Sequence, residues 1–236
     1  TLHIATIEDP VEYELEGVTQ IQVNQKTDLS FANGLRALVR QDPDIIMVGE
    51  IRDNETAGIA VNAAMTGHLV LSTIHANDAA TALVRLLEMG LESFLIASTV
   101  KLVVAQRLAR QLCGRCRVSA PPTSAELVLI RNNSELTKSF AANGYTDPAQ
   151  ALLFTGAGCD LCAGTGFRGR IGLFEVLPVN DGIRDLVVRR ASNAAIAQNA
   201  RAQGVPSLLA AGVVAVLQGK TTLNEVMRVC GSDQTS

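Results

Sequence analysis

The sequence predicts an α/β fold built on a mostly parallel sheet, and two observations carry this prediction. The run Ile45–Val48 is apolar at four consecutive positions, so that strand has no polar face. Such a strand belongs at the centre of a sheet that is covered on both sides. Strand-like and helix-like patterns also alternate along the chain to about residue 112, which is the order of an α/β layer architecture.

Proline, serine and glycine residues mark the ends of the expected strands and helices. Pro10 follows the first strand because proline has no amide hydrogen to donate, and Ser30 can cap the first helix, which stops before Pro43. Glycines close two further helices. We expect strands at 2–7, 45–48 and 69–74, and helices at 31–41, from 54 or 56 to 67, and from 77 or 78 to 90.

The second half of the chain has a different pattern. Apolar residues continue at helical spacing over 93–112. The segment 117–158 is rich in proline, glycine and polar residues, which predicts an excursion at the surface. From Asp181 onwards, four short helical stretches are separated by glycine and proline.

Composition excludes several classes of protein. Of the 236 residues 47% are apolar and 18% are charged, and the formal net charge is −3. These values indicate an ordinary soluble globular protein, neither a basic nucleic-acid-binding protein nor a disordered acidic tail. The weakly polar stretch 207–219 is too short to span a bilayer, and no charged-then-apolar leader opens the chain. We expect a cytosolic protein without direct nucleic-acid binding.

Four cysteines form two C-x-x-C pairs. Cys113 and Cys116 make the first, Cys159 and Cys162 make the second, and 42 residues separate the pairs. Four thiolates placed tetrahedrally, about 2.3 Å from the ion, form a structural zinc site with no open position for catalysis. Two disulfides or a redox-active pair are alternatives, but a chain without an export signal keeps its thiols reduced. We therefore expect zinc or another metal.

Acidic and imidazole side chains follow the three expected strands. Glu8 and Asp9 end the first strand, Glu50 follows the second and His75 follows the third. Ligands meet parallel sheets beyond the carboxyl ends of the strands, so these side chains should converge on one crevice. In phosphoryl transfer one carboxylate holds Mg²⁺ and another orients the nucleophile, while His75 or His68 could contact the terminal phosphate. The plainer interpretation is a solvated loop with structural histidines.

Five arginines are candidates for binding phosphate: Arg36, Arg40, Arg52, Arg168 and Arg170. Arg36 and Arg40 lie four positions apart, on one face of an expected helix. A guanidinium offers phosphate a planar fork of donors, and it can do so from a neighbouring subunit as an arginine finger. Arg52 could act in this way or pair with Asp53, and Arg170 lies in a glycine-rich segment after the second cysteine pair. Solvated faces and local ion pairs are the plainer interpretation.

These motifs, in this order, resemble the secretion ATPases of the type II secretion and type IV pilus assembly family. The segment VRQDPDIIMVGEIRD at 39–53 resembles the family's signature and Walker B region, and TIEDPVE at 6–12 resembles its Asp box. TGHLVLSTIHAND at 66–78 resembles its His box, and the paired cysteines resemble its zinc-binding subdomain. The resemblance covers essentially the whole chain.

The resemblance implies a RecA-like ATPase core at 1–112, a tetracysteine zinc-binding subdomain at 113–175 and a C-terminal helical subdomain at 176–236. It implies a homo-hexamer, peripheral to the inner membrane on its cytoplasmic side, that uses ATP, Mg²⁺ and Zn²⁺. ATP hydrolysis would drive pilus assembly or protein secretion through a membrane platform protein. By position, Glu8 and Glu50 are similar to the family's catalytic acids and His75 to its nucleotide-sensing histidine. The family's arginines near the nucleotide or the subunit boundary correspond by position to Arg36, Arg40, Arg52 and Arg170.

One motif of that family is missing from these residues. No segment matches G-x-x-x-x-G-K-[ST], the loop whose amides and lysine hold phosphates. We therefore expect a truncated chain that hydrolyses ATP poorly by itself. The alternative function is a zinc-stabilised interaction module of the same machinery that hydrolyses nothing, and the acidic balance disfavours a third possibility, a RecA-like DNA motor.

Overall fold

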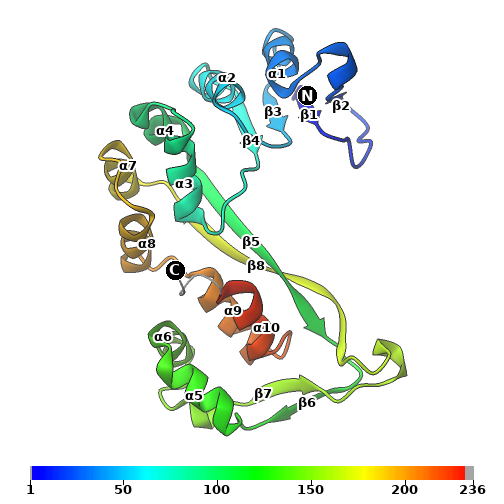
Figure 1. The fold of residues 1–236 in the computed structure, drawn as a ribbon, viewed down its shortest axis with the longest axis vertical. Coiled ribbons are helices and arrows are strands. Elements are labelled where there is room, and N and C mark those ends of the chain that lie inside the picture. Colours follow the sequence, from blue (N-terminus) through cyan, green and yellow to red (C-terminus); the bar gives the residue numbers. More distant parts are fainter. Residues whose placement is uncertain (1, 232–236) are drawn as a thin grey trace. The chain divides into compact units, whose positions relative to one another are not determined.

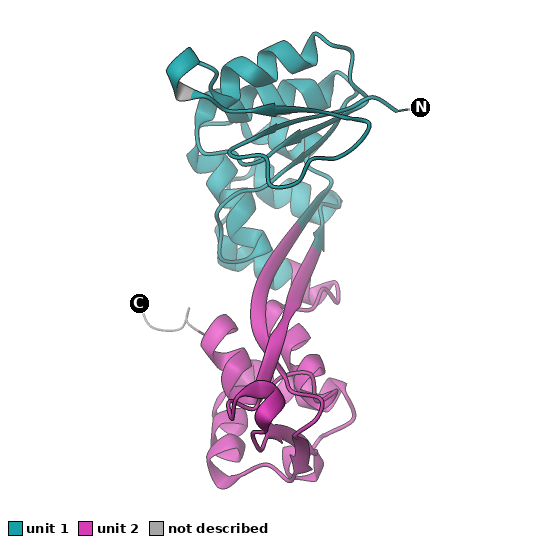
Figure 2. Cartoon of the chain, turned by 90° about the vertical axis from the view of Figure 1, so that its right-hand side faces the viewer, with its two compact units in different colours: residues 1–103, 177–199 teal, residues 104–176, 200–236 magenta. Residues whose placement is uncertain are grey.

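The structure is a computed structural model that describes residues 2–231, apart from the side chain of Gln25. The chain divides into two compact units (Figure 2). Unit 1 combines residues 1–103 with 177–199, and unit 2 combines residues 104–176 with 200–236. Each unit has its own hydrophobic core. The domain ranges expected from the sequence remain a prediction: 113–175 lies wholly in unit 2, and 176–236 contributes to both units.

Unit 1 is built on a four-stranded parallel sheet with the order β2-β1-β3-β4 (Figure 1). Its strands are β1 (Ile4–Glu8), β2 (Val18–Gln22), β3 (Ile45–Val48) and β4 (Leu69–Ser72). The three predicted strands and their parallel pairing are confirmed, and β2 was not predicted. At the edge of this sheet, Leu69 and Leu71 of β4 are 55% and 51% exposed.

Side-chain caps begin most of the helices of unit 1. Ser30 accepts a hydrogen bond from the Asn33 amide at 3.2 Å, and Asp53 accepts one from the Thr56 amide at 2.7 Å. Asp78 caps its helix in the same way. Each cap satisfies a donor that the first helical turn leaves unpaired. The helices lying wholly or mostly in unit 1 are α1 (Phe31–Val39), α2 (Asn54–Met65), α3 (Ala79–Glu88), α4 (Ser93–Thr99), α7 (Asp181–Val188) and α8 (Asn193–Ala202).

The sheet is covered less evenly than expected. Ile7, Ile46 and Val48 are completely buried and pack against α1 and α2. The alternate residues of β3, Ile45 and Met47, are only half-buried. The expectation that β3 is covered on both sides is therefore fully met on one face only within the described residues, because α1 and α2 pack on the same face of the sheet.

The helical spacing predicted over 93–112 is wrong beyond Thr99. There α4 ends, and an 11-residue strand follows, β5 (Leu102–Leu112), which pairs with β8 (Phe167–Pro178). Along the first part of β5, exposed and partly buried side chains alternate, with the period of two that a strand requires. Pairing with a strand far along the chain overrides the local pattern.

The segment 117–158 is not a surface excursion, so that expectation is also wrong. Ile130, Leu136 and Phe140 are completely buried and pack with Val213 and Val226 in the core of unit 2. The further elements of unit 2 are β6 (Arg117–Ala120), α5 (Ser124–Asn132), α6 (Ser134–Ala142), β7 (Leu153–Gly156), α9 (Leu208–Leu217) and α10 (Leu223–Cys230). The four helical stretches predicted after residue 181 are confirmed as α7 to α10.

Across the described part of the chain, no helix combines the length and the apolar character needed to cross a membrane.

Candidate functional site

Three strand ends meet at one edge of the unit 1 sheet. β1, β3 and β4 are parallel neighbours, so their carboxyl ends lie side by side. Glu8 is the last residue of β1, and Glu50 and His75 follow β3 and β4. The Gly49 amide donates to the Ile7 carbonyl at 2.8 Å. A Cβ at Gly49 would lie 3.3 Å from that oxygen, so glycine lets the chain pass close to the end of β1.

Glu50 lies between a guanidinium and an imidazole. Its Oε1 is 2.5 Å from Nη2 of Arg52, and its Oε2 is 3.2 Å from Nε2 of His75. The Glu50 side chain is 13% exposed, whereas those of Arg52 and His75 are 62% and 83% exposed. The hydrogen bond from Arg52 lowers the pKa of Glu50, and His75 adds to the effect against partial burial. The carboxylate is therefore held in its charged form.

Glu8 is held by two residues that the sequence did not indicate. Thr6 Oγ1 donates to Glu8 Oε1 at 2.6 Å, and Gln20 Nε2 donates to the same oxygen at 3.0 Å. Thr6 lies two positions before Glu8, so strand periodicity would have placed it on the same face. Gln20 could not be found in this way, because its position depends on the pairing of β1 with β2.

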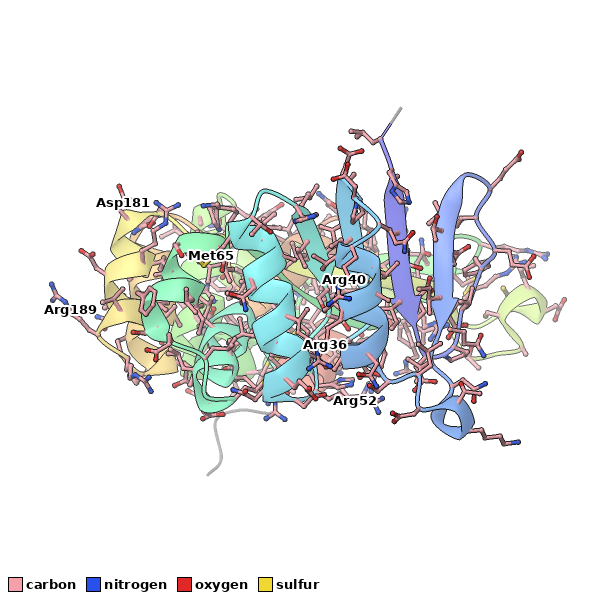
Figure 3. All side chains as sticks on the ribbon, turned by 90° about the horizontal axis from the view of Figure 1, so that it is seen from above. Arg36, Arg40, Arg52, Met65, Asp181 and Arg189 are labelled. Atoms are coloured by element: carbon pink, nitrogen blue, oxygen red, sulfur yellow. The ribbon has the colours of Figure 1, made fainter. Side chains whose placement is uncertain are left out.

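The three candidate arginines of unit 1 occupy different surroundings (Figure 3). Arg36, on α1, forms an ion pair with Glu55 of α2. Arg40 follows the last residue of α1 and is exposed. Arg52 pairs with Glu50 and not with Asp53, because Asp53 caps α2. The hydrogen bond to Glu50 and the negative charge of Glu50 raise the pKa of Arg52, and the charge of Asp9 makes a smaller contribution in the same direction.

One predicted nucleotide-binding residue of unit 1 is not brought to this cluster. His68 precedes β4, so it lies at the amino end of the strand that His75 follows. Its Nδ1 donates to the Ala63 carbonyl at 2.8 Å and lies 3.1 Å from Thr66 Oγ1, which closes the end of α2. Arg170 lies on β8 and belongs to unit 2.

The four predicted cysteine ligands lie together in unit 2. Their sulfurs are all within 4.8 Å of one another, with Cys113–Cys159 and Cys116–Cys162 at 3.8 Å and Cys159–Cys162 at 3.7 Å. Disulfide sulfurs lie about 2.05 Å apart, so these are thiols. Sulfurs placed tetrahedrally about 2.3 Å from a zinc ion are separated by about 3.8 Å. The cluster therefore has the dimensions of a four-thiolate metal site.

Backbone amides surround one of these sulfurs. The amides of Cys159 and Gly166 donate to the sulfur of Cys162 at 3.2 and 3.3 Å. Burial opposes charge on this sulfur, yet these donors lower the pKa of Cys162 to about 6. Burial raises the pKa of its neighbour Cys116 to about 12. A thiolate therefore forms more readily on Cys162 than on Cys116.

Comparisons with known proteins agree over nearly the whole chain. A family model described as Type II/IV secretion system protein matches residues 1–228. Type II secretion system protein E of Pseudomonas aeruginosa is 46% identical over 97% of this chain and 43% of its own length. The type IV pilus assembly ATPase PilB of Thermus thermophilus is 47% identical over 94% of this chain and 24% of its own length. The chain thus spans less than half the length of these curated relatives.

Solved structures share the fold. The pilus retraction motor PilT with bound ADP has a TM-score of 0.67 at 26% identity, over 99% of this chain and 54% of that one. The ATPase DotB of Legionella pneumophila has a TM-score of 0.62 at 20% identity, over 98% of this chain and 52% of that one, a likeness that shows the fold alone. The predicted α/β class with a tetracysteine cluster and a helical C-terminal part is confirmed.

Proposed function

Because the chain belongs to the Type II/IV secretion system protein family, we propose that it is part of a motor that hydrolyses ATP to power type IV pilus assembly or type II protein secretion. The observation that carries the proposal is the position of Glu50, beyond β3 at the sheet edge that Glu8 and His75 share. That edge is where parallel sheets bind their ligands. The names of the relatives, which include a pilus assembly ATPase, support the same chemistry.

Hydrolysis at this edge needs positioned charge more than covalent chemistry. Glu50, kept ionised by Arg52, would orient the attacking water or accept its proton, and Glu8 is the second catalytic acid. His75 contacts Glu50 and would hydrogen-bond the terminal phosphate. Bound Mg²⁺ would neutralise charge on the phosphates, with Asp9 nearby to support it. The remaining residues proposed to contact nucleotide, within one chain or across a subunit boundary, are Arg36, Arg40, Arg52, His68 and Arg170.

The cysteine cluster would hold a structural zinc ion. Its sulfur spacing fits the edges of a zinc–thiolate tetrahedron, and all four positions are filled by protein. When bound, the ion would supply positive charge that keeps the four thiols deprotonated, so metal binding would release protons and stabilise unit 2. Cys113 and Cys116 precede β6, and Cys159 and Cys162 follow β7, so the metal would close the base of this hairpin-like segment.

At the level of the whole machine, we propose a homo-hexamer on the cytoplasmic side of the inner membrane, peripheral to it and coupled to platform and assembly proteins. No direct contact with nucleic acid is proposed. The ring would allow arginines of one subunit to reach nucleotide bound by the next, as an arginine finger does.

The test is phosphate release from ATP by the longest native chain that contains these residues. Glu50→Gln should reduce kcat by about 100-fold or more, because it removes the ionised carboxylate while keeping the shape. Glu88→Gln, an exposed carboxylate at the end of α3, is the matched control and should leave the rate unchanged. Equal rates in wild type and Glu50→Gln would defeat the catalytic assignment of Glu50, and no phosphate release from either would favour a zinc-stabilised interaction module that hydrolyses nothing.

A further inference from the structure

We infer that Gln20 is a positioning residue that fixes the orientation of the Glu8 carboxylate. The inference rests on the proposed function, in which Glu8 is a catalytic acid. The observation that supports it is a set of hydrogen bonds, made by the side-chain amide of Gln20, that joins β1, β2 and the loop between them.

The register of the sheet brings these side chains together. β1 and β2 are parallel, with Thr6 opposite Gln20 and Glu8 opposite Gln22. Paired residues in a parallel sheet point to the same face, and so do residues two positions apart along a strand. All four side chains therefore project from one face of the sheet. Thr6 is buried and Gln20 is half-buried, so both are placed to act as fixed donors.

The orientation of the Gln20 amide is determined by its backbone partners. Its Oε1 accepts a hydrogen bond from the Leu15 amide at 2.7 Å, which only an oxygen can do. Its Nε2 donates to the Tyr13 carbonyl at 3.0 Å, which only a nitrogen can do. A flipped amide would lose both bonds. The group that meets Glu8 is therefore a donor, at 3.0 Å from Oε1.

This arrangement treats the two oxygens of Glu8 differently. Both Thr6 and Gln20 donate to Oε1. Among the side chains that the structure describes, both that donate to the Glu8 carboxylate do so to Oε1 and not to Oε2. One oxygen is thus anchored from two directions, which stops rotation of the carboxylate, and the other is left to act on substrate, water or Mg²⁺. A shift of about 1 Å in a catalytic group can cost about 100-fold in rate.

The chain offers a matched control for this role. Gln22 lies on the same strand and the same face, and its Oε1 accepts a hydrogen bond from the Val11 amide at 3.2 Å. It therefore ties down the same loop, and among the described residues it is Thr6 and Gln20, not Gln22, whose side chains donate to the Glu8 carboxylate. Replacing either glutamine by leucine keeps the side-chain size and removes the hydrogen bonds, so the two variants separate positioning of Glu8 from anchoring of the loop.

The experiment measures kcat and KM for ATP in the longest native chain that contains these residues. Gln20→Leu should lower kcat by about 10- to 100-fold and change KM by less than about threefold, because it acts on a catalytic group and not on nucleotide binding. Gln22→Leu should stay within about twofold of wild type in both. Should Gln20→Leu lower the melting temperature, Gln20→Met tests the same loss of donors with an unbranched side chain.

A double-mutant cycle tests whether Gln20 acts through Glu8. In a Glu8→Ala background, Gln20→Leu should have no further effect on kcat, since its target is gone. Additive effects, or equal effects of Gln20→Leu and Gln22→Leu, would overturn the inference. If Glu8→Ala and Glu50→Gln both keep the wild-type rate, it is the proposed function that fails, and the two failures are distinguishable.

Discussion

Replacing Gly212 by alanine should destabilise unit 2. Gly212 lies within α9, and a Cβ built there would be 2.4 Å from Cγ1 of Val226 and 3.1 Å from its Cγ2. Val226 is completely buried in α10. A valine in a helix has essentially one χ1 rotamer, so it cannot turn this methyl group away without strain. The two helices must therefore move apart to accept the new methyl group.

The geometry sets the size of the effect. Carbon atoms in contact lie about 3.5–4.0 Å apart, so the closest pair would be short by more than about 1 Å. Overpacking of this kind costs about 1–3 kcal/mol, and alanine returns up to about 1 kcal/mol through its higher helix propensity. We expect a net loss of about 1–2 kcal/mol in the free energy of unfolding of unit 2.

Gly58 in α2 is the matched control, because a Cβ there would meet nothing within 4 Å. Gly58→Ala should therefore gain about 0.5–1 kcal/mol from helix propensity alone. Hydrogen exchange measured by mass spectrometry on peptides from α9 and α2 reports each unit separately. The close contact between α9 and α10 would be refuted if the α9 peptides exchanged as slowly in Gly212→Ala as in wild type, while Gly58→Ala behaved as expected.

Three further predictions concern caps, charge and metal. Glu225→Gln should cost about 1–3 kcal/mol, since its buried carboxylate accepts charged hydrogen bonds from Arg228 and Arg110. These hydrogen bonds lower the pKa of Glu225, so their contribution to the free energy of unfolding should be complete above about pH 4.3, the pKa of an unfolded glutamate. The contribution should fall as the pH drops below that value. Urea titrations at several pH values should show this loss of stability in wild type and not in the variant. Asp53→Ala should cost about 1 kcal/mol by removing the α2 cap, measured as a lower melting temperature. Cys113→Ser combined with a metal chelator should abolish binding of about one zinc ion per chain and unfold unit 2, and metal analysis that finds no zinc in wild type would contradict the site.

The sequence predicts those parts of the fold that depend on residues close together along the chain. The apolar run at 45–48 and the cap at Ser30 can be predicted because a buried strand and a helix N-terminus each leave a short signature. The C-x-x-C spacing was readable for the same reason, since two tight turns bring the sulfurs of each pair close. The common edge for Glu8, Glu50 and His75 followed from parallel strands, while the chemical roles of these side chains remain predictions.

Two of the misses, the strand β5 and the role of Gln20, share a physical cause, which is pairing between separate strands. The sequence predicts a helix where β5 lies because the apolar residues there fit both periods over a short range, and only pairing with β8 decides between them. α6 was hidden by its polar composition, although Leu136 and Phe140 stand four positions apart and form one buried stripe. The role of Gln20 depends on the register of β2, which no local pattern encodes.

The outer edge of β4 has a practical consequence for handling the protein. Leu69 and Leu71 are half exposed on a strand that no other described strand pairs on its outer side. Such an edge can recruit the same edge of another molecule and seed insoluble aggregates in concentrated stocks. A lysine in place of Leu71 would serve as a gatekeeper charge, because each added pairing would then have to accommodate a like charge beside it.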